Sequence, residues 1–251
     1  MFPLGMLASM GIVLVLFKAK RHWKERHRLM EMFKTYVSDR VLKDLLQHPS
    51  EAPIRPRIRT LVVMFVDLRG FTAFTERSTP EDVEHFLNHY YALVSETVHR
   101  FQGTVSKFIG DGVLVVFGDP NPLPDQCCVA LFCAKELLEI LLPMVTYHGL
   151  DVGIALHQGD AILGHFGSLR RREYSVFGDV VNTASRLESL NKQFRTRLIF
   201  SEPFVRCVRN VRFLGQHPIR GKSSPLNLYT LPETLPPQSG LPDASNDKPI
   251  L

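Results

Sequence analysis

The feature that most constrains the fold is an unbroken apolar run, Leu61–Val66, which ends in Asp67 and a glycine-containing turn. Such a run, bounded by turn residues, is typical of a buried strand. A second stretch, Val105–Phe117, holds two short apolar segments joined by Gly110-Asp111-Gly112, a pattern that predicts a tight β-hairpin. Each stretch therefore places one carboxylate at the end of a buried strand.

These two carboxylates, Asp67 and Asp111, could meet on adjacent strands and bind hard divalent cations. Mg²⁺ in phosphate chemistry is held in this way, by one or two carboxylates and the substrate's oxygens. The alternative interpretation is that both are ordinary turn or cap residues, the commoner role of an isolated Asp before Gly.

A third stretch, Glu173–Glu188, reads EYSVFGDVVNTASRLE, which predicts a strand, a Gly-Asp start and then a helix. Asn182 and Arg186 are four residues apart and so project from one helical face. An amide can orient sugar hydroxyls, and a guanidinium can meet phosphate charge. Taken alone, such a pair is most often part of a solvated surface.

Together the three stretches resemble the catalytic domain of class III nucleotidyl cyclases, the adenylyl and guanylyl cyclases. The resemblance covers about residues 60–231, and the motifs FVDLRGFT, KFIGDG and FGDVVNTASRLE occur in the expected order. It implies an α+β fold, the family's ferredoxin-like α/β sandwich. It also implies a reaction in which the ribose 3′-hydroxyl attacks the α-phosphorus of the same nucleotide and pyrophosphate leaves.

The resemblance assigns roles to particular residues. Two Mg²⁺ or Mn²⁺ ions would be held by Asp67, Asp111 and the backbone carbonyl of Leu68. The amides around Gly70–Thr72 would cap the phosphates. The remaining contacts to the substrate would come from Phe71, Thr72, Asn182, Arg186 and Lys222.

Within that set, Arg186 matches the arginine that stabilises charge on the α-phosphate, typically worth roughly 3–4 kcal/mol per donor. Asn182 matches the residue that orients the ribose. Lys222, in the stretch IRGK, matches a lysine that grips the β- and γ-phosphates. The alternative for Lys222 is a solvated residue near a strand end.

Base selection is predicted from donors and acceptors. Lys107 can only donate, which suits the N1 acceptor of adenine and clashes with the N1–H and N2 amine of guanine. Guanylyl cyclases place a glutamate at this position. At the partner position, where members that use ATP commonly carry Asp or Thr, this chain departs from the pattern with Ser175, which could serve either base. The sequence therefore favours ATP, mainly through Lys107.

The resemblance further implies a homodimer with two equivalent sites. The metal pair would come from one protomer, and the partner would supply Lys107, Ser175, Asn182, Arg186 and Lys222. The alternatives are a guanylate cyclase, or a catalytically silent membrane-tethered signalling module, which would be expected to lack a metal aspartate or the arginine. A diguanylate cyclase would need a GG(D/E)EF-like signature, which is absent, and a polymerase palm would need a basic groove.

The sequence before the cyclase-like region predicts a membrane anchor. Residues 1–17 are apolar or small and would form a short transmembrane segment. Residues 18–28 carry six basic residues and one acidic residue, a balance of +5 that equals the charge of the whole chain. This cluster predicts a single-pass protein of the cell inner membrane with its catalytic domain in the cytoplasm. It also argues against a nucleic-acid-binding face, because the rest of the chain sums to zero.

The stretch 18–48 has a helical stripe that could form a dimerising coil or pack on its own domain. A linker at 49–59, a catalytic domain at 60–231 and a disordered tail at 232–251 complete the expected organisation. An upstream sensor is left open, because residue 1 could lie inside the last membrane helix of a longer protein. The four cysteines predict reduced, buried thiols.

Helices are expected over residues 80–101, 125–145 and 179–190. Beyond the first hairpin, strands are expected at 151–156 and 161–166, joined by a turn at Gln158-Gly159-Asp160. Three further short strands are expected near 197–200, 211–214 and 226–231. This order predicts a mostly antiparallel sheet with helices on its faces.

Overall fold

The computed structural model describes residues 20, 23, 56–119, 122–168 and 172–235. The chain divides into two compact units, Met1–Pro53 and Ile54–Leu251. In the first, Lys20 and Trp23 are helical and exposed. Among the described residues, no helix has the length and apolar character needed to cross a membrane. The expected membrane segment at 1–17 and most of the expected helix at 18–48 lie outside them.

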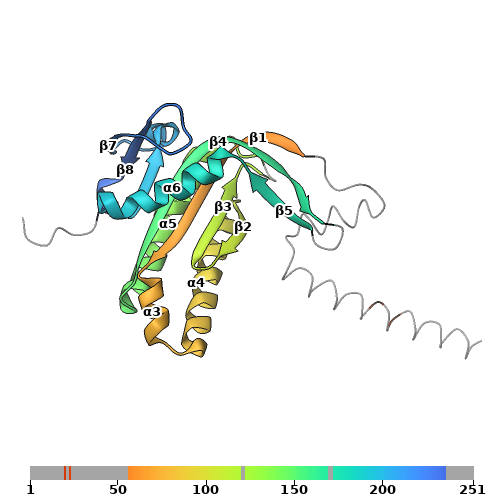
Figure 1. Ribbon diagram of the computed structural model, residues 1–251, viewed down its shortest axis with the longest axis vertical. Helices are drawn as coiled ribbons and strands as arrows, with labels where there is room; N and C mark the ends of the chain where they lie inside the picture. The colour runs from red at the N-terminus through yellow and green to blue at the C-terminus, as the bar shows by residue number, and fades with distance from the viewer. Residues whose placement is uncertain (1–19, 21–22, 24–55, 120–121, 169–171, 236–251) are drawn as a thin grey trace, which may run out of the picture. The chain divides into compact units, whose positions relative to one another are not determined.

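The second unit is built on one mixed sheet (Figure 1). The strand order is β2-β3-β1-β4-β6-β8-β7, with β5 pairing β4 off this path. Every pairing is antiparallel except that of β4 with β6. The strands are β1 (Arg57–Arg69), β2 (Thr104–Ile109), β3 (Gly112–Phe117), β4 (Asp151–Gly167), β5 (Arg172–Phe177), β6 (Leu198–Ser201), β7 (Arg212–His217) and β8 (Leu226–Thr230). The expectation of an α+β fold with a mostly antiparallel sheet is confirmed.

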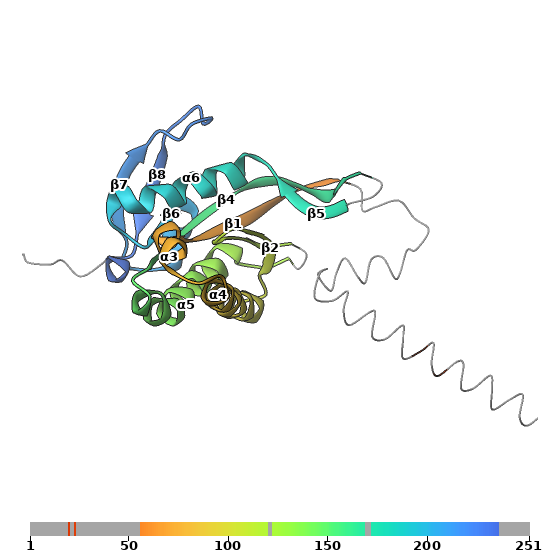
Figure 2. The same ribbon diagram turned by 60° about the horizontal axis from the view of Figure 1, so that its bottom comes forward.

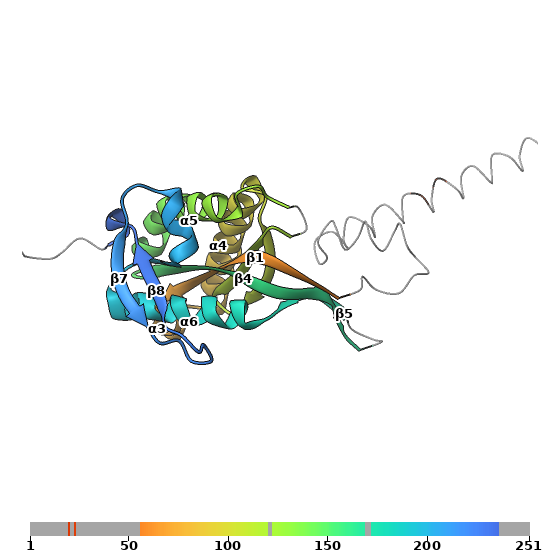
Figure 3. The ribbon, with the colours of Figure 1, turned by 90° about the horizontal axis from the view of Figure 1, so that it is seen from above.

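Helices lie on both faces of this sheet. Figure 3 shows α4 and α5 on one face and α6 on the other. The α-helices are α3 (Phe71–Arg77), α4 (Pro80–Arg100), α5 (Gln126–Tyr147) and α6 (Asp179–Phe194), and two 3₁₀ turns are η1 (Glu202–Cys207) and η2 (Pro232–Thr234). The first turn of α4 is capped by Thr79, whose hydroxyl accepts a hydrogen bond from the Asp82 amide at 3.2 Å.

The middle of β1, Leu61–Val66, is apolar because it is covered on both faces. Val62, Met64 and Val66 belong to the core under α4 and α5, whereas Leu61 and Val63 pack in a second core under α6. Side chains alternate between the faces of a strand. Asp67 therefore lies on the α6 face.

The expected turn at residues 158–160 is wrong, because β4 is one continuous strand. It pairs with β1 over thirteen residues, from Arg57 opposite Leu163 to Arg69 opposite Asp151. Gly159 serves close packing here: a Cβ on it would lie 3.2 Å from the Val180 side chain of α6. The hairpin instead joins β4 to β5, and these strands project with the start of β1 beyond α6 (Figure 2).

Two further expectations need correction. The first strand does not end at Asp67 but continues to Arg69, and the chain enters α3 directly after Gly70, whose φ of +83° suits glycine. The four cysteines are not all reduced, because Cys128 of α5 and Cys207 of η1 form a disulfide across 79 residues of chain. The other two cysteines are free and buried, as expected.

The chain stays ordered slightly beyond the expected end of the catalytic domain. The η2 turn follows β8, and the Thr234 hydroxyl donates to the Leu231 carbonyl at 2.8 Å. Thr196 and Thr230 share a hydrogen bond of 2.7 Å in the same buried cluster. The rest of the expected tail, from residue 236, lies outside the described part of the chain.

Candidate active site

The two predicted metal aspartates lie side by side. The pairing of Val66 with Val113 brings the end of β1 next to the β2–β3 turn that carries Asp111. A Cβ on Gly112 would lie only 3.2 Å from Oδ1 of Asp67, so the turn passes directly over that carboxylate. The adjacency expected from the sequence is therefore present within one chain.

The electrostatics of this pair favour a cation. Burial first, and then the negative charges of Asp111 and Glu188, raise the pKa of Asp67 to about 7. Burial also raises the pKa of Asp111. Two crowded carboxylates with hard oxygen donors fit a divalent cation such as Mg²⁺ or Mn²⁺, which would replace their mutual repulsion with attraction. The Leu68 amide donates a hydrogen bond to Asp67, which partly offsets these shifts.

Helix α4 supports the turn that carries Asp111. The Tyr91 hydroxyl donates to the Gly110 carbonyl, and its ring lies 4.3 Å from that of Phe108 on β2, centroid to centroid. Tyr90 is fully buried, and burial together with the charges of Asp67 and Asp111 holds its phenol pKa well above the usual range. These tyrosines were not predicted as site residues, although their position in the expected helix could have suggested a contact with the hairpin.

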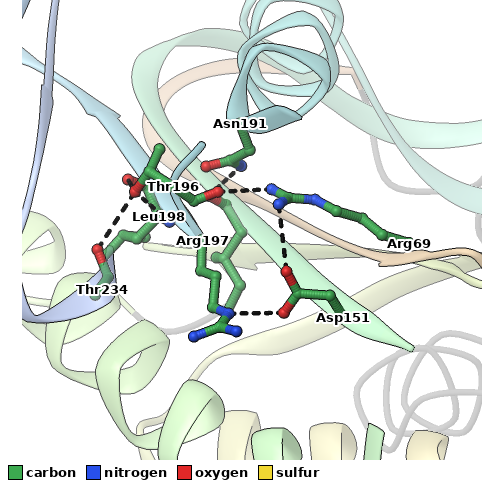
Figure 4. Close-up of polar contacts among 8 residues, drawn as sticks. Arg69, Asp151, Asn191, Thr196, Arg197, Leu198 and Thr234 are labelled. Carbon is green, nitrogen blue, oxygen red and sulfur yellow. Dashed lines mark hydrogen bonds and ion pairs between the residues drawn. The ribbon is translucent and has the colours of Figure 1, made fainter. Parts of the chain in front are cut away.

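Beside the aspartates lies a polar network that joins β1 to β4 and β6 (Figure 4). Arg69 donates to the Thr196 carbonyl at 2.7 Å and lies 3.5 Å from a carboxylate oxygen of Asp151. The other oxygen of Asp151 accepts from Arg197 at 2.7 Å. Asn191 of α6 donates to the backbone carbonyl of Ile154 at 3.0 Å. The network fixes the C-terminal end of β1 relative to the C-terminal end of α6.

The residues predicted to contact the ribose and the phosphates lie at the N-terminal half of α6. Lys222 Nζ lies 2.5 Å from a carboxylate oxygen of Asp179, the first residue of the helix. One turn farther on, Asn182 is exposed. Arg186 donates to the Arg220 carbonyl. The loop that carries Lys222 is therefore tied to the helix that carries Asn182 and Arg186.

The predicted base-selecting residues lie close to one glutamate. Lys107 Nζ on β2 is 3.1 Å from Oε2 of Glu173 on β5, although these strands are not paired in the sheet. Glu173 and Ser175 are two residues apart on β5 and so share one face. Glu173 was not predicted as a site residue, because nothing in the sequence shows that β5 folds back toward β2.

The predicted phosphate-capping residues begin α3. The ring of Phe71 packs 6.0 Å from that of Phe74 and 6.5 Å from that of Phe86. Its side chain is partly buried and packs against the core. The Thr72 side chain is exposed.

A buried histidine lies near the lysine. His157 on β4 is 6% exposed, and its Nδ1 is 2.9 Å from the Ser201 hydroxyl. Burial, and then the charge of Lys222, lower its pKa to about 4. The imidazole is therefore neutral near pH 7.

Residues 55–231 match the family described as adenylate and guanylate cyclase catalytic domain. Adenylate cyclase 1 of Rhizobium meliloti (strain 1021) is 33% identical over 178 residues, which are 67% of this chain and 27% of that protein. Among solved structures, the adenylyl cyclase CyaB from P. aeruginosa is similar with a TM-score of 0.63 and 28% identity, over 70% of this chain and 95% of that one. The guanylyl cyclase Cya2 is similar with a TM-score of 0.61 and 28% identity, over 69% and 91%.

Proposed function

Because the chain belongs to the family of adenylate and guanylate cyclase catalytic domains, we propose that it is an adenylate cyclase. It converts ATP to 3′,5′-cyclic AMP and pyrophosphate at sites shared by two copies of the chain. The observation that carries the proposal is the pair of adjoining carboxylates, Asp67 and Asp111, at the end of β1. The chain spans only 27% of the length of its Rhizobium relative, so the activity of the whole protein is part of the proposal.

Asp67, Asp111 and the carbonyl of Leu68 would hold two divalent cations in each site. When bound, these cations supply the positive charge that acidifies the ribose 3′-hydroxyl and neutralises the triphosphate. The chain contributes two carboxylates fixed on a buried strand and a tyrosine-supported turn, so the pair needs little reorganisation. The backbone at Phe71 and Thr72 would meet the phosphates.

The residues of α6 and its loop act on the nucleotide itself. Asn182 orients the ribose so that its 3′-oxygen faces the α-phosphorus. Arg186 donates to the α-phosphate, where negative charge builds as the bond to pyrophosphate breaks. Lys222 holds the β- and γ-phosphates. To do so, its ammonium group leaves the ion pair with Asp179 and binds the substrate instead.

Base selection rests on Lys107 and Ser175. The ion pair with Glu173 holds the Lys107 ammonium over the β5 face that carries Ser175. From there it donates to N1 of adenine, and the Ser175 hydroxyl accepts from the adenine amino group. A guanylate cyclase is the second candidate, because a serine can also donate to a guanine carbonyl and the guanylyl cyclase Cya2 has a similar structure.

Helix geometry supports a shared site. Nine residues of α6 separate Asp179, which pairs with Lys222, from Glu188, which lies beside Asp67. At a rise of 1.5 Å per residue this is about 14 Å, so the two groups lie far apart along one helix. A second copy related by two-fold symmetry would bring complementary groups together and form two equal sites.

The arm of β1, β4 and β5 offers a surface for that second copy. Ile58 is 71%, Ile162 43% and Phe177 49% exposed. Ile162 pairs with Ile58 on one side and with Phe177 on the other, so the three form one apolar row. Exposed contiguous apolar side chains mark interaction surfaces more often than isolated ones do.

We also propose a location for the protein. An apolar stretch at residues 1–17, followed by six basic residues, supports a single-pass anchor in the cell inner membrane with the cyclase in the cytoplasm. The stretch 18–48 would then hold two anchored chains together.

The test is product analysis of the purified full chain with ATP and with GTP, each with Mg²⁺ and with Mn²⁺. We expect cyclic AMP as the main product and a requirement for a divalent cation. Asp111→Asn, which keeps the size of the side chain and removes its charge, should abolish product formation, while Glu84→Gln on the exposed face of α4 should not. A chain that forms no cyclic nucleotide with either substrate and either cation overturns the proposal.

A further inference from the structure

A third carboxylate lies beside the two aspartates. Glu188 of α6 is only 8% exposed. A Cβ on Gly153 would lie 2.1 Å from Oε1 of Glu188 and 3.1 Å from Nη2 of Arg69, so both side chains pass over the same glycine of β4. Glu188 is therefore buried between α6 and the sheet at the place where Arg69 crosses.

The charges of this cluster act on one another. Burial raises the pKa of Glu188, and the positive charge of Arg69 is the strongest opposing influence. Glu188 and Asp111 in turn are the carboxylates that raise the pKa of Asp67. Three acidic groups and one guanidinium give the cluster a formal charge of −2.

Arg69 lies close enough to Asp67 to pair with it in place of a cation. It follows Asp67 by two residues on β1, so the two side chains share the α6 face. In the folded chain, Arg69 donates to the Thr196 carbonyl at 2.7 Å and lies 3.5 Å from Asp151. The Glu188 carboxylate passes over the same glycine as Arg69, and its negative charge attracts the guanidinium. Without Glu188, attraction would draw the guanidinium toward Asp67, where it would compete with a cation.

We propose that Glu188 is a positioning residue of the metal centre, which keeps Arg69 away from Asp67 and leaves that carboxylate free to bind a divalent cation. The inference rests on the proposed function, because it assumes that Asp67 and Asp111 bind the cation. Glu188 itself need not touch the cation. Its effect passes through Arg69, as outer-shell residues commonly act on metal ligands.

The test measures binding of Mn²⁺ alone to the full chain, by electron paramagnetic resonance of free Mn²⁺, without nucleotide. Glu188→Gln keeps the size of the side chain and lowers the cluster to a formal charge of −1. It should weaken Mn²⁺ binding roughly tenfold, a loss typical of outer-shell substitutions. Glu84→Gln, an exposed carboxylate on α4, is the matched control and should leave binding unchanged.

The decisive variant combines Glu188→Gln with Arg69→Gln, which returns the formal charge to −2 and removes the competing guanidinium. The Mn²⁺ affinity of the double variant should recover to within about twofold of that of the native chain, since the affinity then depends on the aspartates alone. A double variant as weak as Glu188→Gln would mean that Glu188 only supports packing, and the inference would fail.

The two proposals fail in different ways. If the native chain binds Mn²⁺ and Asp67→Asn does not weaken it, the metal assignment is wrong and the inference falls with it. If Asp67→Asn abolishes binding and Glu188→Gln binds as tightly as the native chain, only the role of Glu188 is overturned.

Discussion

At the scale of single residues, the least expected contact is the ion pair between Lys107 and Glu173. Both side chains are about half exposed, so the pair contributes little stability, typically ~0.2–1 kcal/mol. Its value is positional, because it fixes a donor where a purine edge is expected. It also changes how base preference should be tested: glutamate at position 107 alone would face Glu173 with a like charge.

The first prediction therefore combines Lys107→Glu, Glu173→Gln and Ser175→Cys. The new carboxylate can accept from guanine N1–H and N2, and the glutamine no longer repels it. The ratio of GTP to ATP turnover should rise at least about tenfold, as specificity differences of 1–3 kcal/mol imply. Glu173→Gln alone is the control and should keep the preference for ATP. An unchanged ratio in the triple variant would place base selection elsewhere in the site.

The second prediction concerns His157 and acid. Its pKa is about 4 in the fold and about 6.5 in an unfolded chain. Between these values the unfolded chain binds more protons than the folded chain. The contribution of His157 to stability is therefore fully present above pH 6.5 and is lost as the pH falls toward 4. The free energy of unfolding should drop by about 2 kcal/mol between pH 7.5 and pH 5 from this residue.

Urea unfolding at the two pH values measures this effect. His157→Asn removes the titrating group, so its loss of stability over the same interval should be smaller by that amount. An equal loss in both proteins would mean that other groups govern the acid sensitivity.

At the scale of elements, the disulfide between α5 and η1 closes a loop that contains β4, β5, α6 and β6. Cross-linking two positions 79 residues apart restricts the unfolded chain, which the loop-entropy model values at about 4.5 kcal/mol. Reduction should therefore lower the melting temperature by on the order of 10 °C. The control is Cys128→Ala with Cys207→Ala, whose melting temperature should not respond to reductant. Equal melting temperatures of the oxidised and reduced native chain would contradict this prediction.

The apolar row on the arm gives a fourth prediction. Ile162→Asp places a charge at the centre of the row without disturbing the core, and should weaken self-association at least about tenfold. Sedimentation velocity measures the association, and circular dichroism confirms the fold. Tyr147→Asp alters a side chain that is 87% exposed at the end of α5 and is the matched control. Unchanged association in Ile162→Asp would exclude the arm from the interface.

Most elements could be predicted from the sequence because their signals are local. The hairpin needs only Gly110-Asp111-Gly112, and the start of α4 needs only Thr79 and its following proline. The errors came from tertiary contacts. Gly159 suggests a turn until α6 packs on it, and no local pattern joins Cys128 to Cys207.

At the scale of the whole molecule, the proposed site draws on both ends of α6, so its test is complementation between chains. Asp67→Ala and Arg186→Ala should each be nearly inactive as homodimers, because every site carries the lesion. Co-expressed at equal levels, about half of the dimers are mixed, and each mixed dimer has one intact site. Cyclic nucleotide formation should then reach roughly a quarter of the native value. Mixed dimers as inactive as the parents would mean that each site is built within one chain.

The adjacency of Asp67 and Asp111 could be predicted from two strand ends, and the structure shows it. The contact of Lys222 with the start of α6 was not predicted. Glu173 and Glu188 were missed for one reason: each acts on a residue far away in sequence, on another element whose proximity the sequence does not reveal. Charge–charge contacts between distant elements leave no regular residue spacing in the sequence by which they could be predicted.

The thirteen-residue register between β1 and β4 has a further consequence, for changes in chain length. Side chains alternate along β1, so one inserted residue before Asp67 would turn this carboxylate from the α6 face to the core under α4 and α5. The sheet could still form, yet the site would lose its metal ligand and bury a charge. Point substitutions on the exposed faces should therefore be tolerated where single-residue insertions and deletions in either strand are not.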